Sequence, residues 1–274
     1  MKKILLFILL VIALLYVLPI VYTFTNSFMT EDQINRNTIE ILPEQFNLQQ
    51  YYSIALYKGE YFKFFMNSVK LTVVIILGQI VVSSFAAFAF AKMKFTGSNI
   101  IFAVYILAVL LPFQVTLVPN YLVFDMAGRL FHIKLLDTHL AILLPGIFSS
   151  FGVFLMRQFI RGIPDEVIEA ARLDGAGYLR IMFKIILPMI KPAVYVLAVL
   201  TFIDNWNLIE QAVIFLNTPQ KLPLSVFLES IYSDDYKVFF AGSVLYIIPA
   251  LIILIKGEKY LREGLVIGGL KNAE

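Results

Sequence analysis

ILLFILLVIALLYVLPIVYTF, residues 4–24, is an uncharged apolar stretch that follows Lys2 and Lys3. A helix rises about 1.5 Å per residue, so about 20 such residues cross the hydrocarbon core of a bilayer. A cleaved signal peptide has a shorter apolar region, of about 7–15 residues, and ends in an A-x-A pattern, which this segment lacks. We therefore predict that residues 4–24 form a retained transmembrane helix.

Apolar stretches of similar length recur along the chain. Hydrophobic residues make up 60% of it and charged residues 15%, and the mean hydropathy is +0.84, which is unlike a soluble domain. The other uncharged stretches are residues 71–91, 100–119, 140–156 and 238–255. Residues 193–215 are also apolar except for Asp204 and Glu210. The sequence predicts an all-α integral membrane protein with six transmembrane helices.

Positive charges indicate which side of the membrane each segment occupies. Most of the 22 Lys and Arg residues lie in the two terminal segments and in the loops that share their side. Because cytoplasmic segments are enriched in basic residues, we expect a multi-pass protein of the cell membrane with both termini in the cytoplasm. The expected parts are a first helix with an external segment (1–62), a five-helix core (63–256) with a cytoplasmic loop at about 161–188, and a cytoplasmic tail (257–274).

Several kinds of site are not expected. The chain has no Cys and a net charge of only +3 without a basic tract, which argues against thiol chemistry and nucleic-acid binding. His132 and His139 lack metal-ligand spacing, and no G-x-x-x-x-G-K-[ST] loop for nucleotide phosphates is present. We expect no catalytic residue, no metal site and no cofactor in this chain.

The loop at 161–177 reads RGIPDEVIEAARLDGAG and predicts a short helix. Pro164 suits the first turn of a helix, and the two carboxylates after it complement the positive end of the helix dipole. Gly175 and Gly177 provide the permissive backbone that ends the helix. A second short helix over residues 178–187 is expected to stop at Pro188, which makes the loop a helical hairpin.

This loop resembles the EAA loop of importer-type ABC permeases. Glu169-Ala170-Ala171 is followed by Gly175 and by Ile186-Leu187-Pro188 at the spacing of that loop. From about residue 60 to 271, the chain is similar to the shorter permease subunit of maltose-type carbohydrate importers. The further matches are Asn67-Ser68, Pro112, Pro119, Asp137-Thr138, Leu144-Pro145, residues 154–159, Trp206-Asn207, Leu222-Pro223-Leu224, Gly264 and Gly268. Leu208 and Glu258-Lys259 depart from the family pattern, which has an acidic residue and a Gln-Arg pair there.

The resemblance implies the type I ABC importer permease fold and a set of partners. The chain would pair with a second permease subunit, dock on two ATP-binding cassette ATPase subunits and receive a carbohydrate from an extracytoplasmic solute-binding protein, with membrane lipid around it. ATP hydrolysis would belong to the ATPase subunits, so this chain is not expected to be an enzyme. A non-sugar solute, such as a glycerol phosphodiester or an amino acid, is the alternative. An intramembrane enzyme or an ion-driven transporter fits less well, because the sequence shows neither paired catalytic residues nor internal symmetry.

The resemblance also implies which residues act in coupling to the ATPase. The coupling helix would span about residues 164–174 and dock in a groove of the ATPase, where Glu169 would meet a basic residue. The proposed coupling residues are Pro164, Glu169, Ala170, Ala171, Asp174 and Gly175. The tail at 256–274 would contact the ATPase through its segment at 264–269.

A polar stripe in the stretch at 193–215 is the second candidate site. Asp204, Asn207 and Gln211 are three and four positions apart, so one continuous helix would place them on one face. Because such a stripe is unfavourable against lipid, we predict that it lines the translocation path beside the partner permease. The alternatives for Asp204 are that this transmembrane helix begins later in the sequence or that the aspartate pairs locally with a neighbour. Trp206 is assigned to the same path, where its ring would stack on a sugar, with simple packing as an equal alternative.

Overall fold

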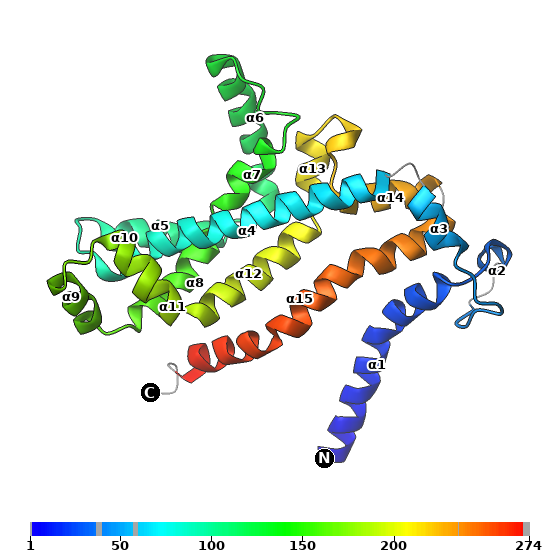
Figure 1. The fold of residues 1–274 in the computed structure, drawn as a ribbon, viewed down its shortest axis with the longest axis horizontal. Coiled ribbons are helices and arrows are strands. Elements are labelled where there is room, and N and C mark those ends of the chain that lie inside the picture. The colour runs from blue at the N-terminus through cyan, green and yellow to red at the C-terminus, as the bar shows by residue number, and fades with distance from the viewer. Residues whose placement is uncertain (1, 37–39, 57–59, 235, 271–274) are drawn as a thin grey trace. The chain divides into compact units, whose positions relative to one another are not determined.

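The computed structural model describes residues 2–36, 40–56, 60–234 and 236–270. Throughout these ranges the regular secondary structure is helical, as predicted. The chain forms two compact units, one of Met1–Met66 with Pro223–Leu251 and one of Asn67–Leu222 with Ile252–Glu274. Figure 1 follows the helices of both units in chain order.

The first unit combines the N-terminal helix with segments from the two longest helices. It contains α1 (Lys2–Asn26), α2 (Glu31–Asn35), α3 (Gln49–Leu56), α14 (Leu224–Asp234) and the first parts of α4 (Glu60–Lys92) and α15 (Tyr236–Leu270). The Gln50 side chain donates hydrogen bonds to the backbone oxygens of Asn26 and Met29, at 2.8 and 3.1 Å, and so holds α3 against the end of α1. The apolar window of α1 has no buried residue, which is the exposure expected of a helix in lipid.

The second unit contains the remaining helices. These are the rest of α4, α5 (Ser98–Val109), α6 (Phe113–Phe131), α7 (Leu140–Ile147), α8 (Ser150–Arg161), α9 (Asp165–Leu173), α10 (Tyr178–Ile181), α11 (Leu187–Met189), α12 (Lys191–Trp206), α13 (Glu210–Phe215) and the end of α15. Helix α8 packs against both α5 and α12. Figure 1 shows α9 at one end of this unit and α13 toward the other.

Within the described residues, four helical segments are long and apolar enough to span a membrane, and up to six if each bent helix pair counts as one span. The four are Lys3–Asn26, Glu60–Lys92, Leu140–Arg161 and Val238–Tyr260. The bent pairs are Ser98–Val109 with Phe113–Phe131, at 107°, and Tyr178–Met189 with Lys191–Trp206, at 81°. The chain is therefore a multi-pass membrane protein.

Two of the predicted spans are interrupted. The stretch at 100–119 breaks before Pro112, because a proline disfavours helical geometry in the residue that precedes it. The stretch at 193–215 is not one helix, since α12 ends at Trp206 and α13 begins at Glu210. Asn207 leaves the helix with φ −96° and ψ 37°, in keeping with the low helix propensity of a side chain that competes for backbone hydrogen bonds.

The second short helix of the predicted hairpin also differs from expectation. The helix does not stop at Pro188 but continues through a π-helical turn, Met182–Ile186, into α11. The amide of Leu187 donates to the oxygen of Met182 in this wider turn. A wider turn accommodates Pro188, which has no N–H to donate and would clash in a regular α-helix.

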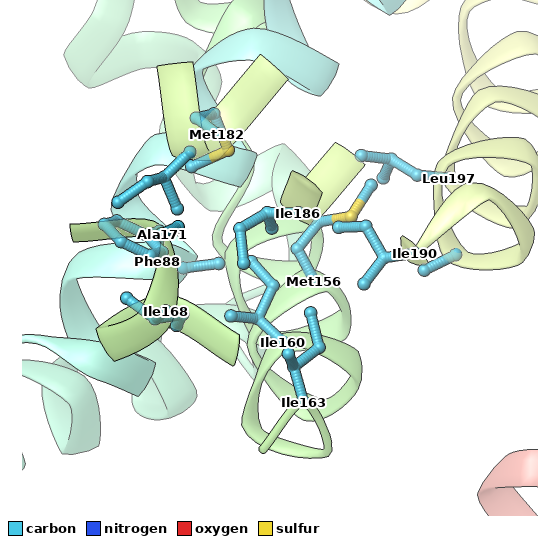
Figure 2. Packing of buried hydrophobic residues seen from close by; sticks show 13 residues of the cluster. Phe88, Met156, Ile160, Ile163, Ile168, Ala171, Met182, Ile186, Ile190 and Leu197 are labelled. Atoms are coloured by element: carbon cyan, nitrogen blue, oxygen red, sulfur yellow. The ribbon is translucent and has the colours of Figure 1, made fainter. Parts of the chain in front are cut away.

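A cluster of buried apolar side chains joins α9 to the longer helices of the second unit. Ile168 and Ala171 come from α9, Phe88 from α4, and Met156 and Ile160 from α8. Figure 2 shows these side chains converging with those of the π-helical turn and of α12. Burying one large apolar side chain contributes about 1.5–3 kcal/mol, so this cluster fixes α9 against three long helices.

Candidate functional site

A cleft of about 640 Å³ opens within the second unit. Its wall is formed by α4, the start of α6, the junction of α7 with α8, and the segment from the end of α12 into α13. The amides that line it are Gln79, Gln114, Asn205, Asn207 and Gln211, and the carboxylates are Asp204 and Glu210. The cleft therefore presents hydrogen-bond donors and acceptors within an otherwise apolar part of the chain.

The structure brings Asp204, Asn207 and Gln211 together in the wall of this cleft. The prediction assumed one continuous helix, whereas the structure has a break between α12 and α13. Asp204 lies in the last turn of α12, Asn207 lies in the break and Gln211 lies in α13. The break, rather than one continuous helical face, is what places the three side chains around a common space.

Trp206 is not part of the cleft lining. Only 4% of this residue is exposed, and its ring stacks on Phe202 with centroids 5.1 Å apart and planes 17° from parallel. The ring therefore packs within α12 and does not line the cleft, and the assignment of Trp206 to the path stays a prediction. The alternative that the sequence left open, simple packing, agrees with this position.

Gln79 is a cleft residue that the sequence analysis missed. Its Nε2 donates to the Gly146 oxygen at 2.7 Å, and its Oε1 accepts from the Thr201 hydroxyl at 2.7 Å. Gly146 lies in the last turn of α7, where carbonyl oxygens lack helical partners. One amide thus joins α4, α7 and α12. The available signal was a single glutamine within the uncharged stretch at 71–91.

The loop at 161–177 forms the helix that its sequence predicts. Helix α9 has Pro164 as its N-cap and Asp174 as its C-cap. Gly175 adopts φ +78°, a left-handed conformation that glycine tolerates best, and its amide donates to the Arg172 oxygen at 2.9 Å. The chain thereby reverses into α10.

Helix α9 has a buried face and an exposed face. Ile168 and Ala171 are buried, whereas Glu169 and Ala170 are exposed and Leu173 is 90% exposed. Of the two alanines among the proposed coupling residues, only Ala170 therefore lies on the surface. Leu173 was not among the predicted coupling residues, although its place four positions after Glu169 puts it on the same helical face. Leu173 thus adds an apolar side chain to the exposed face that Glu169 and Ala170 form.

An ion pair anchors the start of α9 to the end of α4. Lys92 Nζ lies 2.6 Å from an Asp165 carboxylate oxygen and also donates to the backbone oxygen of Ile163. The Lys92 side chain is only 7% exposed, so its charge is partly removed from water. The hydrogen bond and positive charge of Lys92 lower the pKa of Asp165 below its ordinary value.

Asp137 connects the segment before α7 with the segment after α13. Its carboxylate accepts hydrogen bonds from Lys134, from the backbone amides of Asn217 and Thr218, from the Thr218 hydroxyl and from Lys221. Its own amide donates to the Phe215 oxygen at 2.8 Å. The hydrogen bonds from Lys134 and Thr218 hold the pKa of Asp137 well below its usual range.

Part of the predicted tail site lies outside the described residues. Helix α15 extends to Leu270, and residues 271–274 are not described. Near the start of the predicted tail, the ring of Tyr260 stacks on Tyr195 of α12 with centroids 4.0 Å apart. The predicted contact of residues 264–269 with an ATPase stays a prediction.

Comparison with known proteins identifies the family. Residues 79–256 match the model of the binding-protein-dependent transport system inner membrane component. The chain belongs to this family. It is thus an inner-membrane permease component of an ABC importer, as its EAA loop indicated.

Relatives of this permease match nearly its whole length. The arabinooligosaccharide permease AraQ of Halalkalibacterium halodurans is 30% identical, over 95% of this chain and 93% of AraQ. A probable permease for starch degradation products, AmyC of Thermoanaerobacterium thermosulfurigenes, is 33% identical, over 98% and 97%. The sn-glycerol-3-phosphate permease UgpE of Brucella abortus is 30% identical, over 90% of both chains.

A solved structure shares the fold of the permease. The similar chain belongs to a bacterial ABC transporter that imports the acidic polysaccharide alginate. The TM-score is 0.85 over 94% of this chain and 95% of that one, at 24% sequence identity. The fold is accordingly that of a type I ABC importer permease.

Proposed function

We propose that this permease forms, with a second permease subunit, the membrane path for an oligosaccharide delivered by an extracytoplasmic binding protein. The observation that carries the proposal is the cleft of amides and carboxylates at the α12–α13 break. Amide and carboxylate groups hydrogen-bond readily with sugar hydroxyls. Relatives named for arabinooligosaccharides and starch degradation products support a carbohydrate.

We further propose that α9 is the coupling helix and that the ATP chemistry belongs to two separate ATPase subunits. The exposed face of Glu169, Ala170 and Leu173 is available for docking, whereas Ile168 and Ala171 hold the opposite face in the core. Movement of α9 would therefore reach α4, α8 and α12 through the buried cluster. In this proposal both termini lie in the cytoplasm, on the side of α9.

A glycerol phosphate ester, which includes the glycerol phosphodiester named above, is the second candidate solute, because the relative UgpE of Brucella abortus is named for sn-glycerol-3-phosphate. The proposed assembly with a second permease and ATPase subunits is tested by affinity purification from native membranes, mass spectrometry of the subunits and ATPase assays. We expect a second permease, an ATPase and ATP hydrolysis only in the complex. ATP hydrolysis by the purified single chain would contradict the proposal.

A further inference from the structure

The ionisable side chains that line the cleft carry charge of one sign. Asp204 and Glu210 are the carboxylates, and the lining residues, all of which the structure describes, include no Lys, Arg or His. Within the described part of the chain, Asp204 forms no hydrogen bond or ion pair, and the Glu210 carboxylate accepts only a long bond of 3.5 Å from Gln114. The negative charge of the cleft wall is therefore not neutralised by a neighbouring cation.

The basic residues of the adjoining segments contact carboxylates outside the cleft. Lys134 and Lys221 share Asp137, at 2.9 and 3.3 Å, and Arg129 lies 2.8 Å from Asp125. One positive charge is left over in this group, but none of the three cations lines the cleft, so the cleft wall itself remains negative. Two uncompensated carboxylates in a membrane-enclosed space repel anions more strongly than they would in water.

Gln211 adds an acceptor that favours a solute carrying hydroxyl groups. Its Oε1 is buried and has no hydrogen-bond donor among the described residues, although the residue lines the cleft. An unsatisfied buried acceptor gains from a donor. Rotation of the side chain toward the cleft would expose this oxygen, and a sugar hydroxyl can then donate to it, whereas an ionised carboxylate or phosphate group has no proton to give.

We propose that Asp204 and Glu210 determine specificity by making the cleft an electrostatic filter that admits neutral polyhydroxylated solutes and repels anionic ones. This rests on the proposed function, because it takes the cleft as the solute path. The solute of this permease would then differ in charge from the sn-glycerol-3-phosphate of its relative UgpE and from the acidic polysaccharide of the fold neighbour. A neutral oligosaccharide is then the solute class, and a glycerol phosphodiester is not.

The natural absence of Cys permits a direct test of the cleft potential. An Asn207→Cys variant of the assembled complex, in proteoliposomes, is treated with cationic, neutral and anionic methanethiosulfonates of similar size. The ratio of cationic to anionic reaction rates is divided by the same ratio for a free thiol in solution. We expect this quotient to be at least about 5. It should fall toward 1 when Asp204→Asn and Glu210→Gln are added.

Either of two other results would contradict the proposed electrostatic filter. A quotient near 1, or one that Asp204→Asn and Glu210→Gln leave unchanged, means that these carboxylates do not set the potential. Failure of the neutral reagent to react at Asn207→Cys and at Gln114→Cys, with or without ATP, means that solutes do not enter the cleft. Uptake by the complex that contains the natural form of this chain is measured in parallel, so that a complex that imports no solute contradicts the proposed function instead.

Discussion

At the residue scale, Gln79 illustrates how one amide holds three helices. Its two polar atoms are both used, by Gly146 and by Thr201, so a substitution leaves the buried Thr201 hydroxyl and the partly buried Gly146 oxygen without these partners. We predict that Gln79→Leu destabilises the complex by about 1–3 kcal/mol. Thermal unfolding in lipid nanodiscs measures this change. Gln114→Met is the matched control, because among the described residues Gln114 forms only the long bond to Glu210. Equal effects of the two substitutions would contradict the prediction.

Asp137 provides a second prediction at this scale, through pH. Because its pKa is lower in the folded than in the unfolded chain, its stabilising effect is present above the unfolded pKa of about 4 and fades as pH falls toward the folded value. The difference in melting temperature between the natural protein and Asp137→Asn should therefore be larger at pH 7 than at pH 3. Asp125→Asn, which removes a partner only from the exposed Arg129, should show a much smaller difference at pH 7. A pH-independent gap for Asp137→Asn would contradict this assignment.

At the scale of elements, the junction of α4 with α9 makes the coupling loop depend on Lys92. We predict that Lys92→Met lowers solute uptake per ATP by roughly tenfold, because it removes both the Asp165 ion pair and the hydrogen bond to Ile163. The complex should still assemble, since Ile168 and Ala171 remain in the core. Lys92→Arg should retain coupling. Uptake and ATP hydrolysis are measured on equal amounts of assembled complex, and an equal loss in Lys94→Met would show that the effect is not specific to Lys92.

The predicted and observed elements differ where local backbone geometry decides. Apolar stretches of sufficient length locate the spans, because hydrocarbon thickness sets the length of a crossing helix. They do not reveal the bend before Pro112 or the break at Asn207, which depend on how neighbouring helices satisfy the freed backbone groups. The sequence could indicate Asp204, Asn207 and Gln211, because they are polar residues in an apolar stretch. It could not indicate the contacts of Gln79 or the packed position of Trp206, because these depend on the tertiary structure.

At the scale of the whole molecule, the second unit contains both candidate sites. The cleft lies at the α12–α13 break, and α9 packs in the buried cluster to which α12 also contributes. Helix α4 contributes Gln79 to the cleft and Lys92 to the contact with α9, and these positions are about 20 Å apart along an unbroken helix. A rigid helix between two sites is a physical route by which docking at α9 can alter the cleft.

The most direct test of the central claim is ATP-driven uptake of a neutral oligosaccharide by proteoliposomes that contain the permease pair, the ATPase and the binding protein. Glu169→Lys reverses the charge on the exposed face of α9, and Glu60→Lys, at an exposed position at the start of α4, is the control for the same change of charge away from α9. We predict that Glu169→Lys lowers uptake at least about tenfold at unchanged subunit levels, as expected for loss of a charge-assisted contact, and that Glu60→Lys has a smaller effect. Uptake by Glu169→Lys at the rate of the natural complex would contradict the account.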